Sequence, residues 1–357
     1  MAVELGLIEG YYGRPWSWPD REAQADFLQR EGYGFYIYAP KADRILRERW
    51  REPWPAETRA ALARFATHCQ SVGIRFGVGL SPFEIYRDFN DEAKAALAAK
   101  LDDLADLGVQ DLGILFDDMQ GDLPRLAETQ IRILDWITER STASRIIFCP
   151  TYYSDDPALD RGFGVRPPGY LEELGRGLDP RIEVFWTGEE VCSREFSPGH
   201  LARVGESLKR KPLLWDNYPV NDGPRMSPYL YIRGFTGRPA AIGPHIAAHA
   251  VNPALQCWLS RIPLASLAES YREGEAYEYL AAFDRAAAAM MGADAAVLLR
   301  RHLVAMQDTG LAALDDESKA RIRARWSPID HPAAREIIGW LDGDYTITRE
   351  MMDNAEG

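Results

Sequence analysis

The chain has 357 residues, a formal net charge of −13 and 46% hydrophobic residues. This length fits one barrel of eight strand–helix units, which takes roughly 250 residues, together with a small addition. The acidic balance argues against a nucleic-acid partner, because binding to a phosphate backbone relies on lysine and arginine. No apolar run approaches the roughly 20 residues that a membrane span needs, so we expect no membrane partner.

Cysteine usage and the first residues bear on where the protein works. Cys69, Cys149, Cys192 and Cys257 lie far apart and form no C-x-x-C pair. Such spacing favours buried free thiols in a reducing compartment over disulfides. The segment from Met1 to Gly10 already has the pattern of a strand, which leaves no room for a signal peptide. The sequence therefore predicts a cytoplasmic protein.

Apolar runs rich in β-forming residues alternate with stretches of helical periodicity along most of the chain. The predicted strands are Val3–Glu9, Gly34–Ala39, Ile74–Leu80, Leu112–Phe116, Arg145–Cys149, Ile182–Trp186, Pro212–Trp215 and, less clearly, Ile242–Val251. The helices between them include Asp20–Arg30, Ala56–Val72, Glu92–Leu107, Leu123–Glu139, Tyr170–Leu178 and Pro198–Arg210. Alternating units of this kind predict an α/β protein with a parallel sheet, and a count near eight favours a closed TIM (β/α)8 barrel.

The pattern changes near residue 270. Helical stretches follow without strands between them, namely Ala276–Met291, Ala293–Met306, Ser318–Arg325 and Ala333–Leu341. We therefore expect a catalytic barrel over residues 1–270 and a small C-terminal helical appendage over residues 271–345, packed on the barrel or on a second subunit. Asp342–Gly357 has little to bury, so residues 346–357 are expected to be a frayed tail.

Polar side chains gather where the predicted strands end. These positions are Glu9-Gly10, Lys41, Ser81, Asp117-Asp118, Thr151 to Tyr153, Thr187, Asp216-Asn217 and Asn252. The carboxyl ends of barrel strands converge on one mouth, where barrel enzymes carry out their chemistry. The pattern indicates an enzyme.

The run from Gly113 to Met119 is a buried strand that stops on two adjacent carboxylates, Asp117 and Asp118. Two like charges this close have pKa values that are driven apart, so one carboxyl can serve as a general acid while the other stays ionised. The alternative is that the pair caps a helix starting near Leu123, because aspartate is a good N-cap. The polar residues at the other strand ends favour the catalytic interpretation.

Adjacency also bears on mechanism. Two carboxylates that flank a sugar in a retaining enzyme with a protein nucleophile sit roughly 5–5.5 Å apart on opposite faces. Neighbours in sequence are poorly placed for this. They suit substrate assistance, in which the 2-acetamido oxygen of the sugar attacks C1 and forms an oxazoline.

The ordered motifs of this chain resemble those of the O-GlcNAcases of glycoside hydrolase family 84, which include bacterial relatives often labelled hyaluronidases. The motifs are Glu9-Gly-Tyr-Tyr-Gly-Arg-Pro-Trp16, Tyr38-Ala-Pro-Lys41, Phe116-Asp-Asp118, Phe148-Cys-Pro-Thr-Tyr-Tyr153, Trp186-Thr-Gly188, Trp215-Asp-Asn217 with Asn221-Asp222, and Asn252-Pro253. The resemblance runs from about residue 5 to 275, in order and at compatible spacing. It implies a retaining exo-β-N-acetylglucosaminidase that acts on a β-GlcNAc-bearing glycan or glycoprotein, with O-GlcNAc on Ser or Thr of proteins as one such substrate.

The resemblance also implies roles by position. Asp117 corresponds to the residue that orients the acetamide, and Asp118 to the general acid/base. Gly10, Lys41, Asp222 and Asn252 correspond to positions that hydrogen-bond sugar hydroxyls. Tyr153, Thr187, Trp215 and Asn217 correspond to positions that line or order the acetamide pocket, with Cys149 near its floor. No cofactor and no metal are implied.

Two departures from the family pattern affect fine contacts rather than catalytic groups: its Lys-Asp-Asp run reads Lys41-Ala42-Asp43, and Phe in its first motif is Tyr11. The i,i+4 spacing of His245 and His249 lacks the Glu of an H-E-x-x-H metal motif, so we expect structural or surface histidines. Arg44–Arg51 is interpreted as a solvated helix face, and Asp216 is ranked below Asn217 because it could instead orient a loop.

Several alternatives stay open. A chitinase- or hyaluronidase-like endo-glycosidase is the nearest one, although the chitinase run D-x-x-D-x-D-x-E is missing because Met119 and Gln120 follow the Asp pair. A barrel that only binds glycans and a metal-dependent barrel hydrolase are the others. The helical region near the C-terminus offers a surface for a homodimer.

Overall fold

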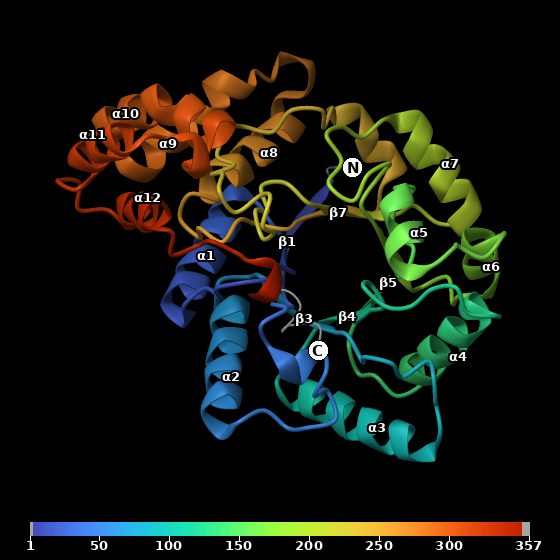
Figure 1. Ribbon diagram of the computed structural model, residues 1–357. Helices are drawn as coiled ribbons and strands as arrows, with labels where there is room; N and C mark the ends of the chain where they lie inside the picture. Colours follow the sequence, from blue (N-terminus) through green and yellow to red (C-terminus); the bar gives the residue numbers. More distant parts are fainter. Residues whose placement is uncertain (1–2, 352–357) are drawn as a thin grey trace.

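The computed structural model describes residues 3–351. Within them, parallel strands form a closed barrel in which neighbours in sequence are neighbours in space and β8 pairs with β1 (Figure 1). The strands are β1 (Glu4–Glu9), β2 (Phe35–Tyr38), β3 (Arg75–Leu80), β4 (Asp111–Leu115), β5 (Arg145–Cys149), β6 (Glu183–Trp186), β7 (Leu213–Asp216) and β8 (Ala248–Val251). The predicted (β/α)8 barrel is confirmed.

Helices surround the barrel and continue beyond it. The α-helices are α1 (Trp18–Glu31), α2 (Ala56–Ser71), α3 (Asp91–Asp106), α4 (Leu126–Thr138), α5 (Pro157–Phe163), α6 (Tyr170–Gly177), α7 (Pro198–Leu208), α8 (Arg261–Glu273), α9 (Tyr279–Met291), α10 (Ala293–Val304), α11 (Asp316–Trp326) and α12 (Pro332–Asp342). Shorter turns are η1 (Arg44–Leu46), η2 (Ala240–His245), η3 (Gly274–Ala276), the π-helical η4 (Ala305–Thr309) and η5 (Leu311–Ala313). No helix among residues 3–351 has the length and apolar character to cross a membrane.

Local sequence explains several of these boundaries. Ser17 caps α1 by accepting a hydrogen bond from the Asp20 amide, and Gly32 ends the same helix in the left-handed conformation. Ser197 caps α7 in the same way ahead of Pro198. The last predicted strand, Ile242–Val251, is too long: its first part is η2, which contains Pro244, and only Ala248–Val251 joins the barrel. Proline has no amide hydrogen for a strand ladder, which explains the difference.

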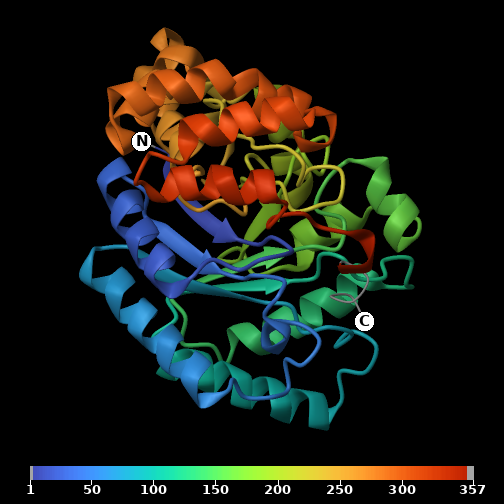
Figure 2. The same ribbon diagram turned by 60° about the vertical axis from the view of Figure 1, so that its left-hand side comes forward.

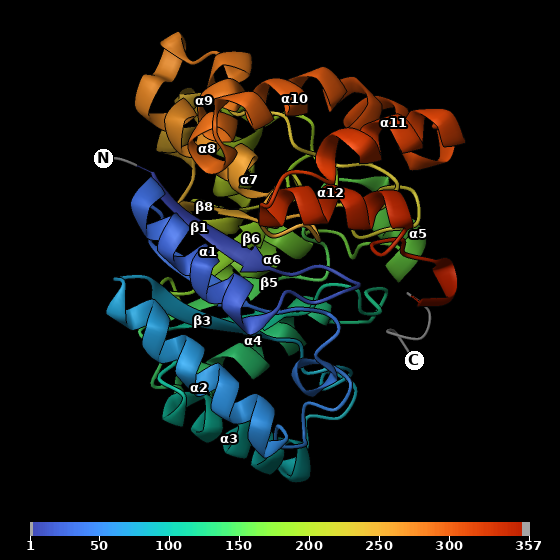
Figure 3. The same ribbon diagram turned by 90° about the vertical axis from the view of Figure 1, so that its left-hand side faces the viewer.

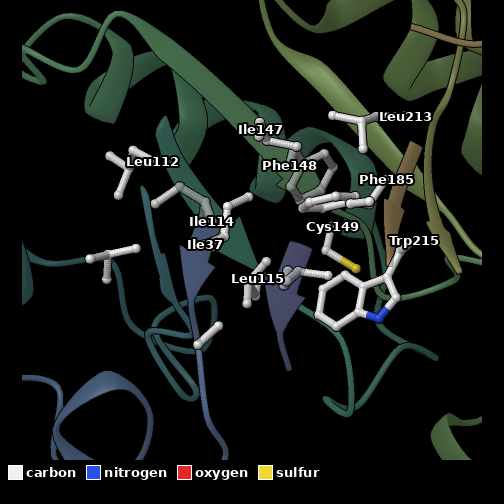
Figure 4. Close-up of a cluster of buried hydrophobic side chains, with 14 of the residues drawn as sticks. Ile37, Leu112, Ile114, Leu115, Ile147, Phe148, Cys149, Phe185, Leu213 and Trp215 are labelled. Atoms are coloured by element: carbon white, nitrogen blue, oxygen red, sulfur yellow. The ribbon is translucent and has the colours of Figure 1, made fainter. Parts of the chain in front are cut away.

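The barrel interior is packed with apolar side chains, as the continuous hydrophobic runs predict. Figure 4 shows part of this cluster, including Ile114 and Leu115 of β4, Phe148 of β5 and Phe185 of β6. Every residue of β4 is buried. The same cluster contains Cys149 and Trp215, which also reach the cavity at the mouth of the barrel. The apolar core of the barrel thus extends to the wall of this cavity.

The opposite end, where the strands begin, is closed by ion pairs. Buried Asp111 pairs with Arg75 (Nε to Oδ1, 3.1 Å) and with Arg145 (Nη1 to Oδ2, 3.5 Å). Glu4 pairs with both arginines, at 2.7 Å and 3.2 Å, and Glu183 pairs with Arg145. We call these five side chains the base network. They come from the first residues of five strands and tie the sheet together.

The C-terminal helices form a layer against one side of the barrel (Figure 2). Their apolar side chains gather in a second core around Trp326 and Trp340, both fully buried. Leu259, just before α8, and Ile262, in its first turn, belong to this second core, while the same helix also packs on the barrel. The boundary expected near residue 270 falls inside α8, so the division into two domains stays a prediction.

The segment after α12 returns to the end of the barrel where the strands finish (Figure 3). Ile347 is buried there, its amide donates to Ser227 Oγ at 3.0 Å, and its side chain packs beside Gly13. Gly13 has φ 100°, and a Cβ at this position would lie 2.3 Å from Ile347 Cδ1. The expectation of a frayed tail from residue 346, based on Asp342–Gly357 having little to bury, is therefore wrong at Ile347, and residues 352–357 of the expected tail lie outside the described residues.

Candidate active site

A cavity of about 170 Å³ opens at the carboxyl ends of the strands. All the side chains proposed from the sequence for catalysis and substrate binding line it. They are Gly10, Lys41, Asp117, Asp118, Cys149, Tyr153, Thr187, Trp215, Asn217, Asp222 and Asn252. These residues come from the carboxyl ends of seven barrel strands and the loops that follow them, so the barrel mouth brings together positions that are far apart in sequence.

The Asp pair lies in the connection between β4 and α4. β4 ends at Leu115, and α4 begins at Leu126 after Arg125, with no side chain accepting a capping hydrogen bond. The alternative in which Asp117 and Asp118 cap this helix is therefore wrong. The backbone of Asp118 has φ 56°, in the left-handed region that a side chain rarely occupies.

Asp117 is buried and, within the described part of the chain, forms an ion pair with Lys41. Lys41 Nζ is hydrogen-bonded to its Oδ2. Its Oδ1 is buried and has no hydrogen-bond partner within residues 3–351. A buried carboxylate oxygen without a donor is costly, and such groups in native proteins point to a functional requirement. Asp117 is thus ready to accept a hydrogen bond from a ligand.

Asp118 lies among several donors. Tyr12 Oη donates to its Oδ2 at 2.9 Å, and Tyr153 Oη lies 3.5 Å from its Oδ1. Lys41 Nζ and Arg47 Nη1 each lie 3.7 Å from Oδ2. Burial acts to raise the pKa of Asp118, but the two cations and the two phenols outweigh it and hold the pKa below its usual value. The adjacency of the two carboxyls predicts a raised pKa for one of them, as acid catalysis needs. At Asp118 the surrounding charges lower the pKa instead.

Opposite the Asp pair, a hydrogen-bonded chain of amides orders the wall of the cavity. Asn217 Oδ1 accepts hydrogen bonds from Trp215 Nε1 and Asn252 Nδ2, both at 3.0 Å, and Asn217 Nδ2 donates to the Val191 carbonyl at 2.8 Å. Asn252 Oδ1 in turn accepts from the Gly10 amide at 3.2 Å. This chain fixes the side chains whose remaining polar atoms line the cavity.

Glycine is required at position 10 for close packing. A Cβ there would lie 2.4 Å from Cζ2 of the Trp215 indole, which is closer than any real contact. The backbone of the β1–α1 loop therefore approaches the tryptophan face directly. Two residues later in the same loop, Tyr12 donates its amide to Asp222 Oδ2 at 2.9 Å. Burial raises the pKa of Asp222 to about 6.

Cys149, Tyr153 and Thr187 line a further part of the cavity. Thr187 donates its amide to the Tyr153 carbonyl at 2.9 Å, which joins the β5 and β6 ends. Burial raises the pKa of the Cys149 thiol and of the Tyr153 phenol, so both are neutral at ordinary pH. Neutral, partly apolar groups of this kind suit an acetyl methyl group.

The structure adds cavity residues that the sequence argument missed: Tyr12, Val191, Cys192 and Val220. The doubled tyrosine of the first motif was the available signal for Tyr12. Cys192 is exposed at the cavity, so the expectation of four buried thiols is wrong at this position, although the four cysteines are free.

Arg47 was also missed, because Arg44–Arg51 was interpreted as a solvated helix face. That interpretation is wrong for Arg47, which is 3% exposed and lies behind Asp118. The segment is a short 3₁₀ turn followed by turns rather than an α-helix, so its exposure follows no helical period. Arg44 in the same segment is indeed exposed and pairs with Glu48.

Asp216 and His249 form a structural network beside the site. Asp216 is buried and pairs with Arg238 and with His249 Nε2 at 3.0 Å, while His249 Nδ1 contacts Tyr271 Oη at 2.9 Å. His249 is therefore a structural histidine. Across residues 3–351, no three His, Cys, Asp or Glu side chains are grouped so that they could hold a metal ion.

Comparison with known proteins shows which family this chain belongs to. The profile of the beta-N-acetylglucosaminidase family matches residues 5–303. The curated rat and mouse proteins named Protein O-GlcNAcase are each 29% identical to this chain over 276 residues, which is 75% of this chain and 30% of theirs. The chain thus spans about a third of the length of these relatives.

A solved structure is also similar over almost the whole chain. It is a mutant of the O-GlcNAc hydrolase of Thermobaculum terrenum, with a TM-score of 0.81, 29% identity, and coverage of 98% of this chain and 86% of that chain. The resemblance inferred from the motifs is confirmed. The chain belongs to the beta-N-acetylglucosaminidase family.

Proposed function

We propose that the protein is a retaining exo-β-N-acetylglucosaminidase that uses the acetamide of its own substrate as the nucleophile. The observation that carries the proposal is that Asp117 lines the cavity while its buried Oδ1 has no donor among the described residues. An acetamide N–H is a donor of the right kind for it. A carboxylate that accepts this hydrogen bond increases the electron density on the acetamide oxygen and orients it toward C1.

The first step breaks the glycosidic bond. The acetamide oxygen forms a bond to C1 while the bond between C1 and the leaving oxygen breaks, and Asp118 gives its proton to that oxygen. Asp117 stabilises the positive charge that develops on the acetamide nitrogen. In the second step Asp118 takes a proton from water, the water oxygen bonds to C1, and the oxazoline ring opens. Two attacks at C1 retain the β configuration.

The lowered pKa of Asp118 fits the second step directly, because a general base must be ionised. The first step needs a protonated carboxyl. A sugar that fills the cavity removes further water from Asp118, and desolvation raises the pKa of a carboxyl. The proposal therefore includes a pKa that rises when substrate binds.

The remaining side chains of the cavity fit a single terminal sugar. Asp222, Asn252 and the Lys41 ammonium provide hydrogen-bonding groups for hydroxyls, and a small cavity at the end of the barrel suits one ring better than a long chain. The relatives named O-GlcNAcase support O-GlcNAc on serine or threonine of proteins as a substrate. No observation in the cavity favours an endo-acting chitinase or hyaluronidase, or a barrel that only binds glycans.

The test uses a synthetic peptide that carries β-GlcNAc on serine, with release of the sugar followed by mass spectrometry. We expect release by the protein, micromolar or tighter inhibition by a GlcNAc-derived thiazoline that mimics the oxazoline, and no effect of a chelator. The same peptide with α-linked GlcNAc is the control and should stay intact. Loss of activity in chelator with recovery on adding a divalent ion, together with indifference to the thiazoline, would overturn the proposal.

A further inference from the structure

Asp118 has an unusual backbone for an acid that must be placed accurately. Its φ of 56° lies in the left-handed region, where an L side chain crowds its own carbonyl. Conformations of this kind persist only when the surrounding structure holds them, and they gather at active sites. A contact from a neighbouring segment must therefore hold the backbone of Asp118.

Arg47 meets Asp118 at both its backbone and its side chain. Its Nη2 donates to the Asp118 carbonyl oxygen at 3.4 Å, and its Nη1 lies 3.7 Å from Asp118 Oδ2. Nη1 also donates at 3.3 Å to Tyr12 Oη, which itself donates to Asp118 Oδ2. The guanidinium is planar and presents its donors in a fixed geometry, so these contacts restrain one another.

The position of Arg47 is itself fixed. The residue is 3% exposed, and it ends η1 by donating its amide to the carbonyl of Arg44, the first residue of that turn. Its guanidinium lies 5.6 Å from the centroid of the Phe83 ring. It therefore reaches Asp118 from a buried and packed position. A solvated arginine would have many conformations, and this one has few.

We propose that Arg47 is a positioning residue that holds Asp118 in its strained conformation and aims the carboxyl at the leaving oxygen. The proposal rests on the proposed function, in which Asp118 is the general acid and base. Arg47 is not among the described residues that line the cavity, and it acts through Asp118 and Tyr12.

Arg47 and Lys41 have different tasks in this arrangement. Lys41 is hydrogen-bonded to Asp117 and lies 3.7 Å from Asp118, so it influences both carboxylates. The contacts of Arg47 with the Asp pair are to Asp118. The charged and titratable groups that face Asp118 from the surrounding elements are Tyr12, Lys41, Arg47, Asp117, Cys149, Tyr153 and Asp222.

Loss of Arg47 should affect substrates unequally. A poor leaving group, such as the methanol of methyl β-GlcNAc, needs a proton from a well-placed acid. The 2,4-dinitrophenolate of the corresponding aryl glycoside leaves without one. A misplaced Asp118 therefore slows the first reaction far more than the second. Loss of the positive charge also raises the pKa of Asp118, so the basic limb of the kcat/KM profile moves to higher pH.

The experiment compares kcat/KM for these two glycosides across pH in four proteins: wild type, Arg47→Met, Arg47→Lys and the control Arg44→Gln. For Arg47→Met we expect a loss of roughly 100-fold or more on the methyl glycoside, only a few-fold on the dinitrophenyl glycoside, and a basic limb at higher pH. Arg47→Lys keeps the positive charge but loses the paired donors of the guanidinium. The basic limb of its pH profile should therefore stay near that of wild type, while part of the selective loss on the methyl glycoside remains. Arg44→Gln alters an exposed pair of the same segment and should behave like wild type.

Equal losses on both glycosides, or no loss on either, would overturn the assignment of Arg47. Should Arg47→Met fail to fold by circular dichroism, Arg47→Lys decides the question through its ratio of the two losses. Asp118→Asn, measured beside them, separates this inference from the proposed function. If Asp118→Asn shows the selective loss and the Arg47 variants do not, Arg47 is not a positioning residue; if Asp118→Asn shows none, the acid/base role itself fails.

Discussion

The two ends of this barrel both contain buried carboxylates beside cations, yet the pairs are built differently. In the base network, Asp111 has an arginine on each of its oxygens, and both arginines pair with further glutamates. At the mouth, Asp117 has Lys41 on one oxygen and no donor on the other among residues 3–351, and Asp118 has a left-handed backbone. Both oxygens of Asp111 are thus paired with cations, whereas one buried oxygen of Asp117 has no hydrogen-bond donor among residues 3–351.

This difference separates stability from function. A fully paired buried carboxylate contributes to the fold only as long as every partner is present. An unpaired oxygen and a strained backbone destabilise the free protein and are useful only when a ligand meets them. We therefore expect substitutions at the mouth to remove activity and substitutions at the base to remove stability.

Asp118→Asn should have the largest effect and should act on activity alone. Removing the proposed general acid and base is expected to lower kcat on a poor leaving group by about 10²–10⁴-fold. Asparagine tolerates a left-handed backbone and can still accept the hydrogen bond of Tyr12, so the melting temperature should stay close to that of wild type. Kinetics and calorimetry on the same preparation check both halves. A large fall in melting temperature would contradict the assignment of activity, and not stability, to the mouth of the barrel.

Asp111→Ala at the base should do the reverse. It leaves Arg75 and Arg145 with only Glu4 and Glu183 as partners, and removing one member of a buried ion pair costs up to about 3–5 kcal/mol of unfolding free energy. Urea denaturation gives the loss, and kcat of the folded fraction should match wild type. A variant as stable as wild type but inactive would contradict the assignment of this network to stability.

Gly10→Ala tests how closely the mouth is packed. The added methyl would lie 2.4 Å from the Trp215 ring, so either the loop or the indole must move. A displacement on the order of 1 Å in a site of this kind costs up to roughly 100-fold in kcat/KM. The control is Gly199→Ala in α7, where the nearest atom to an added Cβ is 3.8 Å away at the end of the flexible Arg203 side chain. Equal kinetics for the two variants would mean that the Gly10 contact has no bearing on the site.

The smallest expected effect is a pH dependence from Asp222. Its pKa is raised to about 6, so the carboxyl is neutral below that pH and ionised above it. An ionised carboxylate accepts hydrogen bonds from sugar hydroxyls more strongly, so the affinity of the protein for free GlcNAc should rise as pH increases through about 6. In Asp222→Asn this rise should be absent while the affinity, measured by calorimetric titration, stays low throughout. An unchanged rise in the variant would assign the pH dependence of binding to another group.

The sequence allowed much of this to be predicted, for physical reasons. Alternating apolar runs and amphipathic helices predict a barrel, and in a barrel every strand end lies at one mouth. Positions as distant as Gly10 and Asn252 could therefore be placed together without knowing any contact between them.

What could not be predicted depends on contacts between distant segments and on irregular backbone. Arg47 follows a 3₁₀ turn with no period to reveal its burial, and Ile347 is buried only because the chain returns to Gly13. Nothing in the residues around Asp118 signals its positive φ, because aspartate occurs in every kind of turn.

The central claim is that the substrate acetamide is the nucleophile, held by Asp117. Its most direct measurement is kcat/KM for aryl β-glycosides whose acetyl group carries no, one, two or three fluorines. Fluorine withdraws electrons from the carbonyl oxygen and weakens it as a nucleophile, so the account predicts a steep and continuous fall across the series. Equal values for all four substrates would contradict participation of the acetamide and remove the role given to the free oxygen of Asp117.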